Sequence, residues 1–384
     1  MLVEEKNIKE YAKKNIGIDA SNIVIGGGLT QLKYFLDYYE KNHLNDFGIY
    51  LFCNEKIFDE INFKYINKVN IGTLPSNNLL FRLFWVLFKL PKLLKKFSCS
   101  ILFAPGGLVF LRNIYSVTMF RNMQPFQIEK STLYGFSFKS LRILILRYLF
   151  LLSFKIAKKV IFLSKNSEEI IKQKINIDNR TEIVSHGVNY NSDFQFSKNY
   201  ILKKSVSFIY VSSLDVYKNH IQLLNAFNEL RKTLNVNLTI IGSTPYEKKF
   251  KEIINLKNKF DPDNNFLFIK KHMSHDDVLN YYNSFDIGIH ASSCENFPNI
   301  VVEMLSRGLP VITSDISIMR EILGKDYIYF DGKNSSSIVE KISEFLQSSK
   351  YIDYLNNRKN LFIKNYDLDK QQKKIFQILN NERI

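Results

Sequence analysis

Cysteine is scarce in this sequence, which has three among 384 residues, at positions 53, 99 and 294. An odd number of widely spaced cysteines provides neither a disulfide framework nor the spacing of a metal site, and this indicates a reducing compartment. The N-terminus lacks the basic and then apolar order of a signal peptide. No run of 18 apolar residues is free of charge. We therefore expect a cytoplasmic protein without a membrane-spanning helix.

Acidic residues are nearly missing from one part of the chain. Residues 75–160 contain nine lysines and five arginines but a single acid, Glu129, and carry most of the net charge of +16. Two segments there, 79–97 and 141–159, place Lys and Arg among Leu, Phe and other apolar residues. Such segments suit either an anionic membrane surface or burial with the cations reaching solvent. We expect burial for 141–159, which is apolar nearly all round, and leave both interpretations open for 79–97.

Nucleic acid is a third partner that a basic stretch can indicate. No recognised nucleic-acid-binding motif accompanies the charge, so we do not expect nucleic acid as a partner.

Short β-rich runs alternate with longer helical patterns, and the alternation occurs twice, on either side of a polar segment at 189–204 that we interpret as a linker. This order predicts the α/β class, with two Rossmann-like domains that each contain a parallel sheet. The first helix is expected at 30–40, with Thr30 as its N-cap. Ligands of such sheets bind beyond the C-terminal ends of the strands, so we expect the site in a cleft between two facing domains. The expected strands lie at 15–20, 48–53, 100–104, 116–120, 160–164, 206–212, 238–242, 266–269, 287–290 and 310–313.

The most informative block spans residues 287–315. An apolar strand ends in a polar turn that contains Glu295, a helix containing Glu303 begins near Pro298, and a second strand follows Gly308. The first amides of a helix suit an anion such as a diphosphate. Glu303 can accept hydrogen bonds from vicinal hydroxyls such as those of a ribose, and Glu295 can hold sugar hydroxyls or a transient charge. Two glutamates at this spacing, taken alone, are more often solvated surface residues. The long pattern of residues around them in the block 287–315 favours a ligand site instead.

This block closely resembles the C-terminal signature of glycosyltransferase family 4, which consists of retaining enzymes with the GT-B fold. The family's two glutamates, separated by seven residues, match Glu295 and Glu303. The segment 209–220 resembles the strand and loop that open the family's second domain, and Lys218 matches a lysine that contacts the donor diphosphate. Many members have an arginine shortly before it, where this chain has Ser213. The resemblance implies Lys218 and Glu295 as catalytic residues, with donor contacts from Ser213, Lys218, Glu295, Asn296, Phe297, Asn299, Ile300, Val301 and Glu303.

Parts of the N-terminal half resemble a subset of the same family. The glycine run 26–28 resembles a loop that borders the donor phosphate and the acceptor, which implies donor contacts from Gly27 and Gly28; a plain tight turn is the alternative. Arg121 and Asn122 stand where many members place a histidine near the sugar. Asn122 is implied to bind a sugar hydroxyl, with a turn cap as the alternative. His186 lies in a turn that resembles the end of the first domain, and we expect a structural role for it.

Two motifs are set aside. His290 precedes Glu295 on an apolar strand, where a histidine is more often a hydrogen-bonded core residue than a catalyst. Asp261 and Asp263 have the spacing of an Asp-x-Asp metal motif, but they lie in an Asn-rich loop with no third ligand, and we interpret them as a turn. The resemblance implies an enzyme that needs neither a metal nor a cofactor.

The resemblance implies transfer of a sugar, with retention, from a UDP- or GDP-sugar to a hydroxyl of a glycan acceptor in cell-surface polysaccharide or lipopolysaccharide biosynthesis. The basic apolar region suggests a lipid-linked acceptor and contact of residues 79–97 with the inner face of the cell membrane. The expected domains are an acceptor-side domain at 1–190, a nucleotide-sugar-binding domain at 191–365 and a terminal helix at 366–384 that packs back on the first domain. The alternatives are a non-catalytic sugar-binding module, an epimerase or phosphorylase of the same fold, and a nucleic-acid-binding protein.

Overall fold

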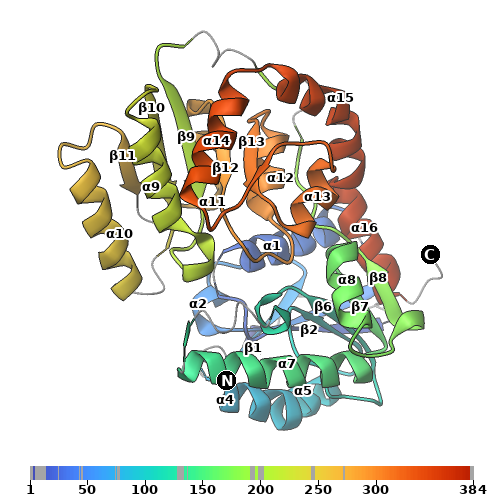
Figure 1. Ribbon diagram of the computed structural model, residues 1–384. Coiled ribbons are helices and arrows are strands. Elements are labelled where there is room, and N and C mark those ends of the chain that lie inside the picture. Colours follow the sequence, from blue (N-terminus) through green and yellow to red (C-terminus); the bar gives the residue numbers. More distant parts are fainter. Residues whose placement is uncertain are drawn as a thin grey trace. The chain divides into compact units, whose positions relative to one another are not determined.

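The chain forms two units in the computed structural model. The first consists of Met1–Ser131, Gly135–His186 and Asp369–Ile384, and the second of Thr132–Tyr134 and Gly187–Leu368. Each is described by itself, and Figure 1 labels the elements. The structure describes residues 3–4, 14–24, 26–42, 44, 46–73, 75, 78–127, 134–135, 137–190, 195–197, 203–243, 247–270 and 273–380. Parts of the expected linker at 189–204 lie outside these residues.

The first unit is built on an eight-stranded sheet in the order β1-β4-β3-β2-β5-β6-β7-β8. All described pairs are parallel except that of β1 with β4. The central strands are apolar and buried on both faces, as parallel strands covered by helices must be. The strands are β1 (Val3–Glu4), β2 (Lys14–Ala20), β3 (Phe47–Cys53), β4 (Ile66–Asn70), β5 (Cys99–Pro105), β6 (Tyr115–Phe120), β7 (Lys159–Phe162) and β8 (Thr181–Ile183).

The order of strands shows where the first sheet changes direction. The chain moves outward from β2 through β3 to β4, returns to pair β5 with β2, and then moves outward on the other side through β6, β7 and β8. The loops after β2 and β5 therefore diverge at one place, which is the topological switch point of the sheet.

Helices cover the first sheet (Figure 1). The segment expected at 79–97 is helical from Leu79 to Lys96, with a π-helical turn in its middle. Residues from Asp369 onward belong to this unit, where Phe376 stacks on Phe35 with ring centroids 4.4 Å apart. The helices are α1 (Gly27–Lys41), α2 (Glu55–Phe58), α4 (Leu79–Phe84), the π-helix η1 (Trp85–Lys89), α5 (Leu90–Lys96), α7 (Phe138–Ile156), α8 (Lys165–Lys172) and α16 (Leu368–Leu379).

The first helix begins three residues earlier than expected. Its N-cap is Gly26, which has a φ of 69°, and Thr30 lies inside the helix, so the prediction of Thr30 as the cap was wrong. Glycine adopts this backbone conformation without steric cost, which lets the turn after β2 enter the helix directly.

The burial expected for residues 141–159 was wrong for one face of α7. Ile143, Leu146, Phe150 and Phe154 are buried, but a second row of apolar side chains is exposed, including Tyr148 at 72%. A helix on one side of a sheet can bury only the stripe that points toward the sheet, however apolar its other side chains are. The exposed row consists of Phe138, Leu141, Leu144, Ile145, Tyr148 and Leu152.

The second unit is built on a parallel six-stranded sheet in the order β11-β10-β9-β12-β13-β14. The chain winds outward from β9 through β10 to β11, then returns to pair β12 with β9, where Ile287 lies opposite Phe208. The switch point of this sheet therefore lies between β9 and β12. The strands are β9 (Val206–Val211), β10 (Val236–Ile241), β11 (Leu267–Lys270), β12 (Ile287–His290), β13 (Val311–Ser314) and β14 (Tyr329–Phe330).

The helices of the second unit follow the predicted alternation. Gly288 in β12 is required by packing, because a Cβ atom there would lie 2.4 Å from the sulfur of Met304 on α12. The close approach fixes α12 against the strand that precedes it. The helices are α9 (His220–Leu230), α10 (Glu247–Phe260), α11 (His275–Tyr281), α12 (Asn299–Ser306), α13 (Ser317–Leu323), α14 (Ser335–Leu346) and α15 (Lys350–Asn365).

Four strands, β1, β4, β8 and β14, are not among the expected strands. The apolar sequence pattern of β4 is interrupted by Asn67 and Lys68, which are buried although they are polar. The structure satisfies Lys68 by a 3.0 Å hydrogen bond from its Nζ to the carbonyl oxygen of Phe58. β14 has only two residues, which is too short for a periodic pattern.

None of the helices in the described ranges has the combined length and hydropathy needed to cross a bilayer. The segment 79–97 instead divides its apolar side chains, with Val86 and Leu90 in the core and Leu80 and Phe88 exposed. Burial therefore holds for one face of this segment, and contact of the exposed face with a membrane stays a prediction.

Asp261 organises the turn between α10 and β11. It is buried, and its carboxylate accepts hydrogen bonds from the amides of Asn265, Phe266 and Leu267 at 2.8–2.9 Å. Burial raises the pKa of Asp261, but the three donors outweigh this effect and lower it. Asp263 is exposed. The pair is a turn, as expected.

We expect Asp261→Ala to lower the free energy of unfolding by roughly 2–3 kcal/mol, because three amides lose a charged acceptor. Urea denaturation at pH 7 measures this change. The matched variant Asp263→Ala should change the free energy by less than about 0.5 kcal/mol. Equal effects of the two substitutions would contradict the role assigned to Asp261.

Candidate functional site

The loops after β9 and β12 bring the two predicted catalytic residues of the second unit together. Lys218 ends the short 3-10 helix Val216–Lys218 that follows β9, and Glu295 lies in the turn that follows β12. Because β9 and β12 are neighbouring parallel strands, these loops emerge at the same edge of the sheet, at its switch point. The proximity of residues separated by 77 positions is a consequence of this topology.

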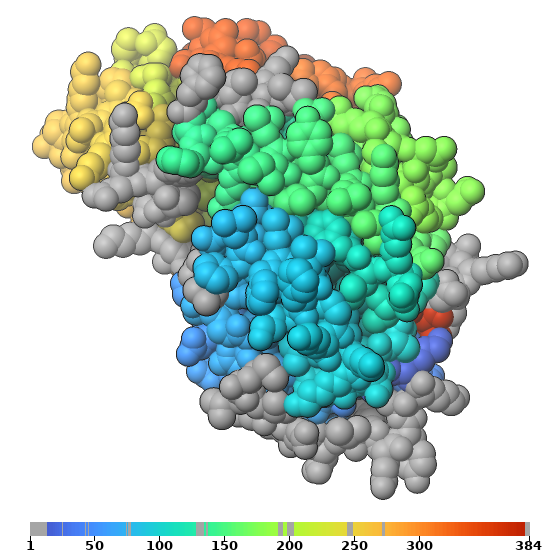
Figure 2. Space-filling model, turned by 90° about the horizontal axis from the view of Figure 1, so that it is seen from below, coloured from blue at the N-terminus to red at the C-terminus, as the bar shows by residue number. Residues whose placement is uncertain are grey.

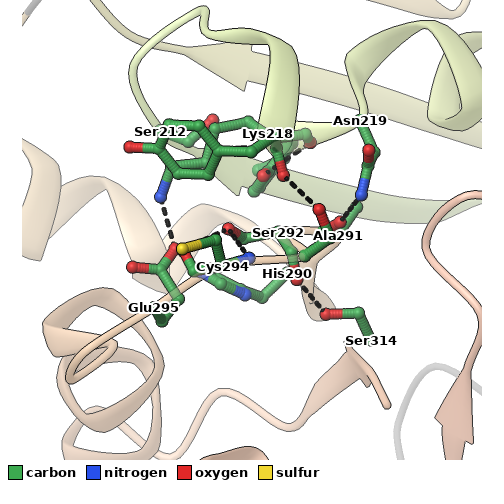
Figure 3. A network of polar contacts seen from close by, with 12 residues as sticks. Ser212, Lys218, Asn219, His290, Ala291, Ser292, Cys294, Glu295 and Ser314 are labelled. Atoms are coloured by element: carbon green, nitrogen blue, oxygen red, sulfur yellow. Dashed lines mark hydrogen bonds and ion pairs between the residues drawn. The ribbon is translucent and has the colours of Figure 1, made fainter. Parts of the chain in front are cut away.

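Lys218 and Glu295 form a direct ion pair between Nζ and Oε1 (Figure 3). Their side chains are 11% and 14% exposed. Burial opposes the charge of each group, but the opposite charge of the partner outweighs it, so that the pKa of Lys218 is raised and that of Glu295 is lowered to about 2. Both groups are therefore ionised throughout the neutral range.

His290 is a third member of this cluster. It is buried on β12, and its Nε2 lies 3.3 Å from the Oε1 atom of Glu295. Burial lowers the pKa of His290, so the ring is neutral near pH 7 and donates from Nε2 to the carboxylate. The strand pattern indicated a core histidine, and only the structure places it against Glu295.

The backbone of the two loops is held by side-chain hydrogen bonds (Figure 3). The amide of Asn219 donates to the carbonyl oxygen of Ala291 at 2.7 Å, and the Ser314 hydroxyl donates to the carbonyl oxygen of Ser292. Asn219 and Ser314 thus tie the β9 loop and the end of β13 to the β12 turn. Lys218 and Glu295 are positioned by a network rather than by their own contact alone.

Glu303 lies on α12, buried, and pairs with a residue that the sequence did not suggest. Its Oε1 lies 3.0 Å from the Nε2 atom of His275, the first residue of α11. Its Oε2 is buried and has no hydrogen-bond partner. A buried carboxylate oxygen without a donor is costly, and a ligand hydroxyl would satisfy it. No motif around His275 indicated this contact, because the two residues are 28 positions apart.

More of the backbone amides at the start of α12 already have hydrogen-bond acceptors than was predicted. Pro298 is its N-cap. The amides of Asn299 and Val301 donate to the carbonyl oxygens of Phe297 and Pro298. Of the three predicted contacts Asn299, Ile300 and Val301, Ile300 is the one whose amide makes no backbone hydrogen bond in the described turn. The number of amides that this helix offers to an anion is therefore smaller than a bare helix start would provide.

The other residues of the second unit that were predicted to contact the sugar donor differ in how deeply they are buried. Phe297 packs on Tyr366 with ring centroids 5.7 Å apart, and Asn296 is buried beside it in the chain. Ser213 is half-buried in the loop after β9. Phe297 and Val301 contribute to the core of the unit, so their side chains are not placed to contact a ligand.

Gly27, Gly28 and Asn122 belong to the first unit. The guanidinium of Arg121 donates to the carbonyl oxygens of Gly27 at 2.9 Å and Gly28 at 3.5 Å, and thereby joins the start of α1 to the end of β6. The side chain of Asn122 accepts a hydrogen bond from the amide of Gln124 at 3.1 Å, which is the turn-capping alternative. Gly28, Arg121 and Asn122 line a cavity of ≈350 Å³ at the switch point of the first sheet.

His186 is buried in the same unit, where its Nδ1 lies 3.1 Å from the amide nitrogen of Gln371. Burial, together with the nearby charge of Arg121, holds the pKa of His186 well below its usual value. A neutral, hydrogen-bonded ring is consistent with the structural role expected for it.

No group of three or more His, Cys, Asp or Glu side chains in the described ranges could hold a metal ion. Lys218 places a positive charge at the second switch point.

Residues 191–365 match the family described as glycosyl transferases group 1. This match covers the second unit, including Lys218, Glu295 and Glu303. The second unit is therefore a group 1 glycosyltransferase domain.

Curated relatives agree with this family. The chain is 26% identical to protein CapJ of Staphylococcus aureus over 188 residues, which are 48% of this chain and 46% of that protein. It is 32% identical to the serotype-specific mannosyltransferase WbdA of Escherichia coli over 142 residues, which are 36% of this chain and 17% of that protein. The chain thus spans half or less of the length of these relatives.

Solved structures show the fold over nearly the whole chain. Sucrose-phosphate synthase from Thermosynechococcus elongatus has a TM-score of 0.77 at 11% identity, covering 96% of this chain and 98% of that one. HepE from Anabaena, in complex with UDP and glucose, has a TM-score of 0.71 at 15% identity, covering 96% and 99%. The chain has the GT-B fold, as predicted.

We expect the contribution of His275 to stability to depend on pH. Its hydrogen bond to Glu303 is the main cause that raises the pKa of His275 in the folded protein. A raised pKa means that the stabilisation is fully present below the unfolded value of about 6.5 and is lost as the pH rises through the folded value. His275→Gln should therefore lower the free energy of unfolding by roughly 1 kcal/mol more at pH 5.5 than at pH 9.

Urea denaturation of both proteins at the two pH values measures this difference. Asp263→Asn, at an exposed position in the turn before β11, serves as the control and should show a much smaller pH-dependent change. A loss in His275→Gln that is equal at both pH values would show that the ring acts by packing alone.

Proposed function

We propose that this group 1 glycosyltransferase moves a sugar from a nucleotide diphosphate sugar to a hydroxyl of a glycan acceptor, with retention of the anomeric configuration. The observation that carries this proposal is the buried cluster of Lys218 and Glu295 at the switch point between β9 and β12. Open parallel sheets bind their ligands at such a point.

Lys218 is proposed to bind the donor diphosphate. Its charge is balanced by Glu295. A bound diphosphate would share the ammonium group and stabilise the negative charge that develops as the sugar leaves. The ammonium is held in a buried position before the reaction, so little reorganisation is needed at that step. This supports transfer without a bound metal or cofactor.

Glu295 is proposed to stabilise positive charge on the reacting sugar. Its pKa, lowered to about 2, keeps it ionised and unsuited to donate a proton near neutral pH. It is also engaged by Lys218 and His290, so we assign it neither acid nor base. The acceptor proton would then pass to the leaving phosphate, which is the route implied by the family resemblance.

Glu303 is proposed to bind the ribose of the donor. Its buried Oε2 atom lacks a donor, while Oε1 is held by His275. A ribose hydroxyl supplies the missing donor. The single backbone amide left without a helix partner, that of Ile300, is the contact proposed for a phosphate oxygen at the start of α12.

The names of the relatives support the choice of substrates. HepE was solved with UDP and glucose, and WbdA is named a mannosyltransferase. We therefore propose a UDP- or GDP-hexose as donor and a role in cell-surface polysaccharide or lipopolysaccharide biosynthesis, at the inner face of the cell membrane. A non-catalytic module that only binds nucleotide sugars is the rival, since Ser213 removes one cation from the implied phosphate site.

The test begins with a thermal-shift screen of the wild type against UDP-, GDP- and dTDP-sugars, since a ligand of the folded state raises the Tm with concentration. Transfer and donor hydrolysis are then measured with the donor found. Lys218→Met should lower kcat/KM by about 100-fold or more, since it removes a buried charge from the leaving group. Glu303→Gln should lower it about tenfold, mainly through KM.

Glu340→Gln, at an exposed position on α14, is the matched control and should keep kcat/KM within twofold. NMR of the product should show the anomeric configuration of the donor. The proposal fails if Lys218→Met and Glu303→Gln both retain transfer within tenfold of the wild type. Donor binding without transfer or hydrolysis would favour the non-catalytic module.

A further inference from the structure

Three arginines gather at the switch point of the first sheet. Arg82 on α4, Arg121 after β6 and Arg142 on α7 line the cavity of ≈350 Å³, together with Asn22 and Gly28. No acidic residue is among the described residues that line it. Arginine combines a permanent charge with a planar set of donors that matches phosphate oxygens.

Arg82 has an unsatisfied donor in this cavity. Its Nε is buried and has no hydrogen-bond partner, and its Nη2 makes only a long contact of 3.4 Å to the carbonyl oxygen of Gly106. Burial is the main cause that lowers the pKa of Arg82; Asp19 opposes this effect and Arg142 adds to it. A buried cation with a free N–H is costly unless a ligand supplies an acceptor.

The nearby carboxylate of Asp19 offsets only part of the positive charge of the three arginines. Asp19 is buried, and its Oδ1 accepts hydrogen bonds from the indole of Trp85 and the amide of Ser21, both at 3.1 Å. Arg121 in turn is held by the carbonyl oxygens of Gly27 and Gly28, which are neutral. The cavity therefore retains an excess of positive charge.

Exposed apolar side chains flank this cavity on two helices. Figure 2 shows the face on which α4, in blue, lies beside α7, in green. Leu80 on α4 is 75% exposed and Phe138 on α7 is 90% exposed, and Arg142 lies on α7 among exposed residues. Large apolar side chains exposed in such number on neighbouring helices indicate an interaction site. The members on α4 and the following turn are Leu80, Phe81, Phe84, Leu87 and Phe88.

We propose that the arginine cavity binds the phosphate of a membrane lipid that carries the acceptor, while the apolar residues of α4 and α7 insert among its hydrocarbon chains. This inference rests on the proposed function, because it names the chemical class of the acceptor: a glycan linked through phosphate to a long apolar chain.

Two properties favour a lipid over a soluble phosphate. A soluble anion would bind the arginines, but it would make no favourable contact with the exposed Leu and Phe side chains beside them. A membrane uses both, since apolar side chains enter the interface while cations attract anionic headgroups. The lysines of the helical turns that follow α4, Lys89 on η1 and Lys92 and Lys96 on α5, add charge that is complementary to such a surface.

The probe is a phosphatidylcholine vesicle containing 5 mol% polyprenyl phosphate, with pure phosphatidylcholine as the reference, and binding is measured by co-sedimentation. The wild type should bind the first at least tenfold more tightly than the second. The double variant Arg82→Gln/Arg142→Gln should lose this preference. Phe84→Ser/Tyr148→Ser should lose binding to both kinds of vesicle by at least tenfold.

Lys155→Ala and Leu361→Ser are the matched controls, an exposed lysine elsewhere on α7 and an exposed leucine in the second unit, and each should bind within twofold of the wild type. Each variant is first checked for an unchanged Tm. Arg142→Gln alone, at an exposed position, replaces the double variant if that protein fails to fold, and should lower the preference at least threefold.

Three results would overturn the inference. Complete competition by 5 mM inorganic phosphate would assign the cavity to a soluble anion. Equal binding of vesicles containing polyprenyl phosphate and of those containing phosphatidylglycerol, unchanged in the arginine variant, would reduce the face to a nonspecific membrane contact. Absence of binding to all vesicles would exclude a lipid. Because these measurements need no donor and no turnover, their failure is distinct from a failure of the proposed transfer reaction.

Discussion

The reversal of winding direction in each parallel sheet is the constraint on which the rest of this structure depends. Right-handed crossovers place the connecting helices on one face while the chain moves one way along a sheet and on the other face when it moves back. A strand order that extends on both sides of the first central strand must turn back once. The turn lies between β2 and β5 in the first sheet and between β9 and β12 in the second. The loops on either side of each turn separate, and polar side chains can be placed there without interrupting the covered faces of the sheet.

The two switch points handle buried positive charge in different ways. Lys218 is balanced by a full negative charge on Glu295, and the surrounding hydrogen bonds of Asn219 and Ser314 hold the two loops in place. Such a pair contributes little net stability, because the attraction only offsets the loss of hydration of both ions. Arg121 and Arg82 are satisfied in part by neutral backbone carbonyl oxygens, and Asp19 offsets only part of the charge of the first cavity. Both arrangements favour an anionic ligand, and the second does so more directly.

The same contrast separates the two glutamates of the 287–315 block. Glu295 is saturated by Lys218 and His290, whereas Glu303 keeps one buried oxygen without a donor. A carboxylate that is saturated can stabilise charge without exchanging protons, and one that is unsatisfied can accept a hydroxyl. The division of roles between charge stabilisation and ribose binding thus has a physical basis in the hydrogen bonds of each group.

The sequence by itself determined the α/β class and most strands, because the alternation of apolar runs and helix patterns is a local property. It also placed the motif residues on the loops that follow strands. It also indicated Lys218, Glu295 and Glu303 through a resemblance carried by neighbouring residues. Only the tertiary structure decided that His290 and His275 contact these glutamates, that Gly26 rather than Thr30 caps the first helix, and that α7 exposes half of its apolar side chains. Those facts depend on which strands become neighbours and which stripe of a helix meets the sheet. Residues far apart in the chain settle them, and no local pattern of residue types contains that information.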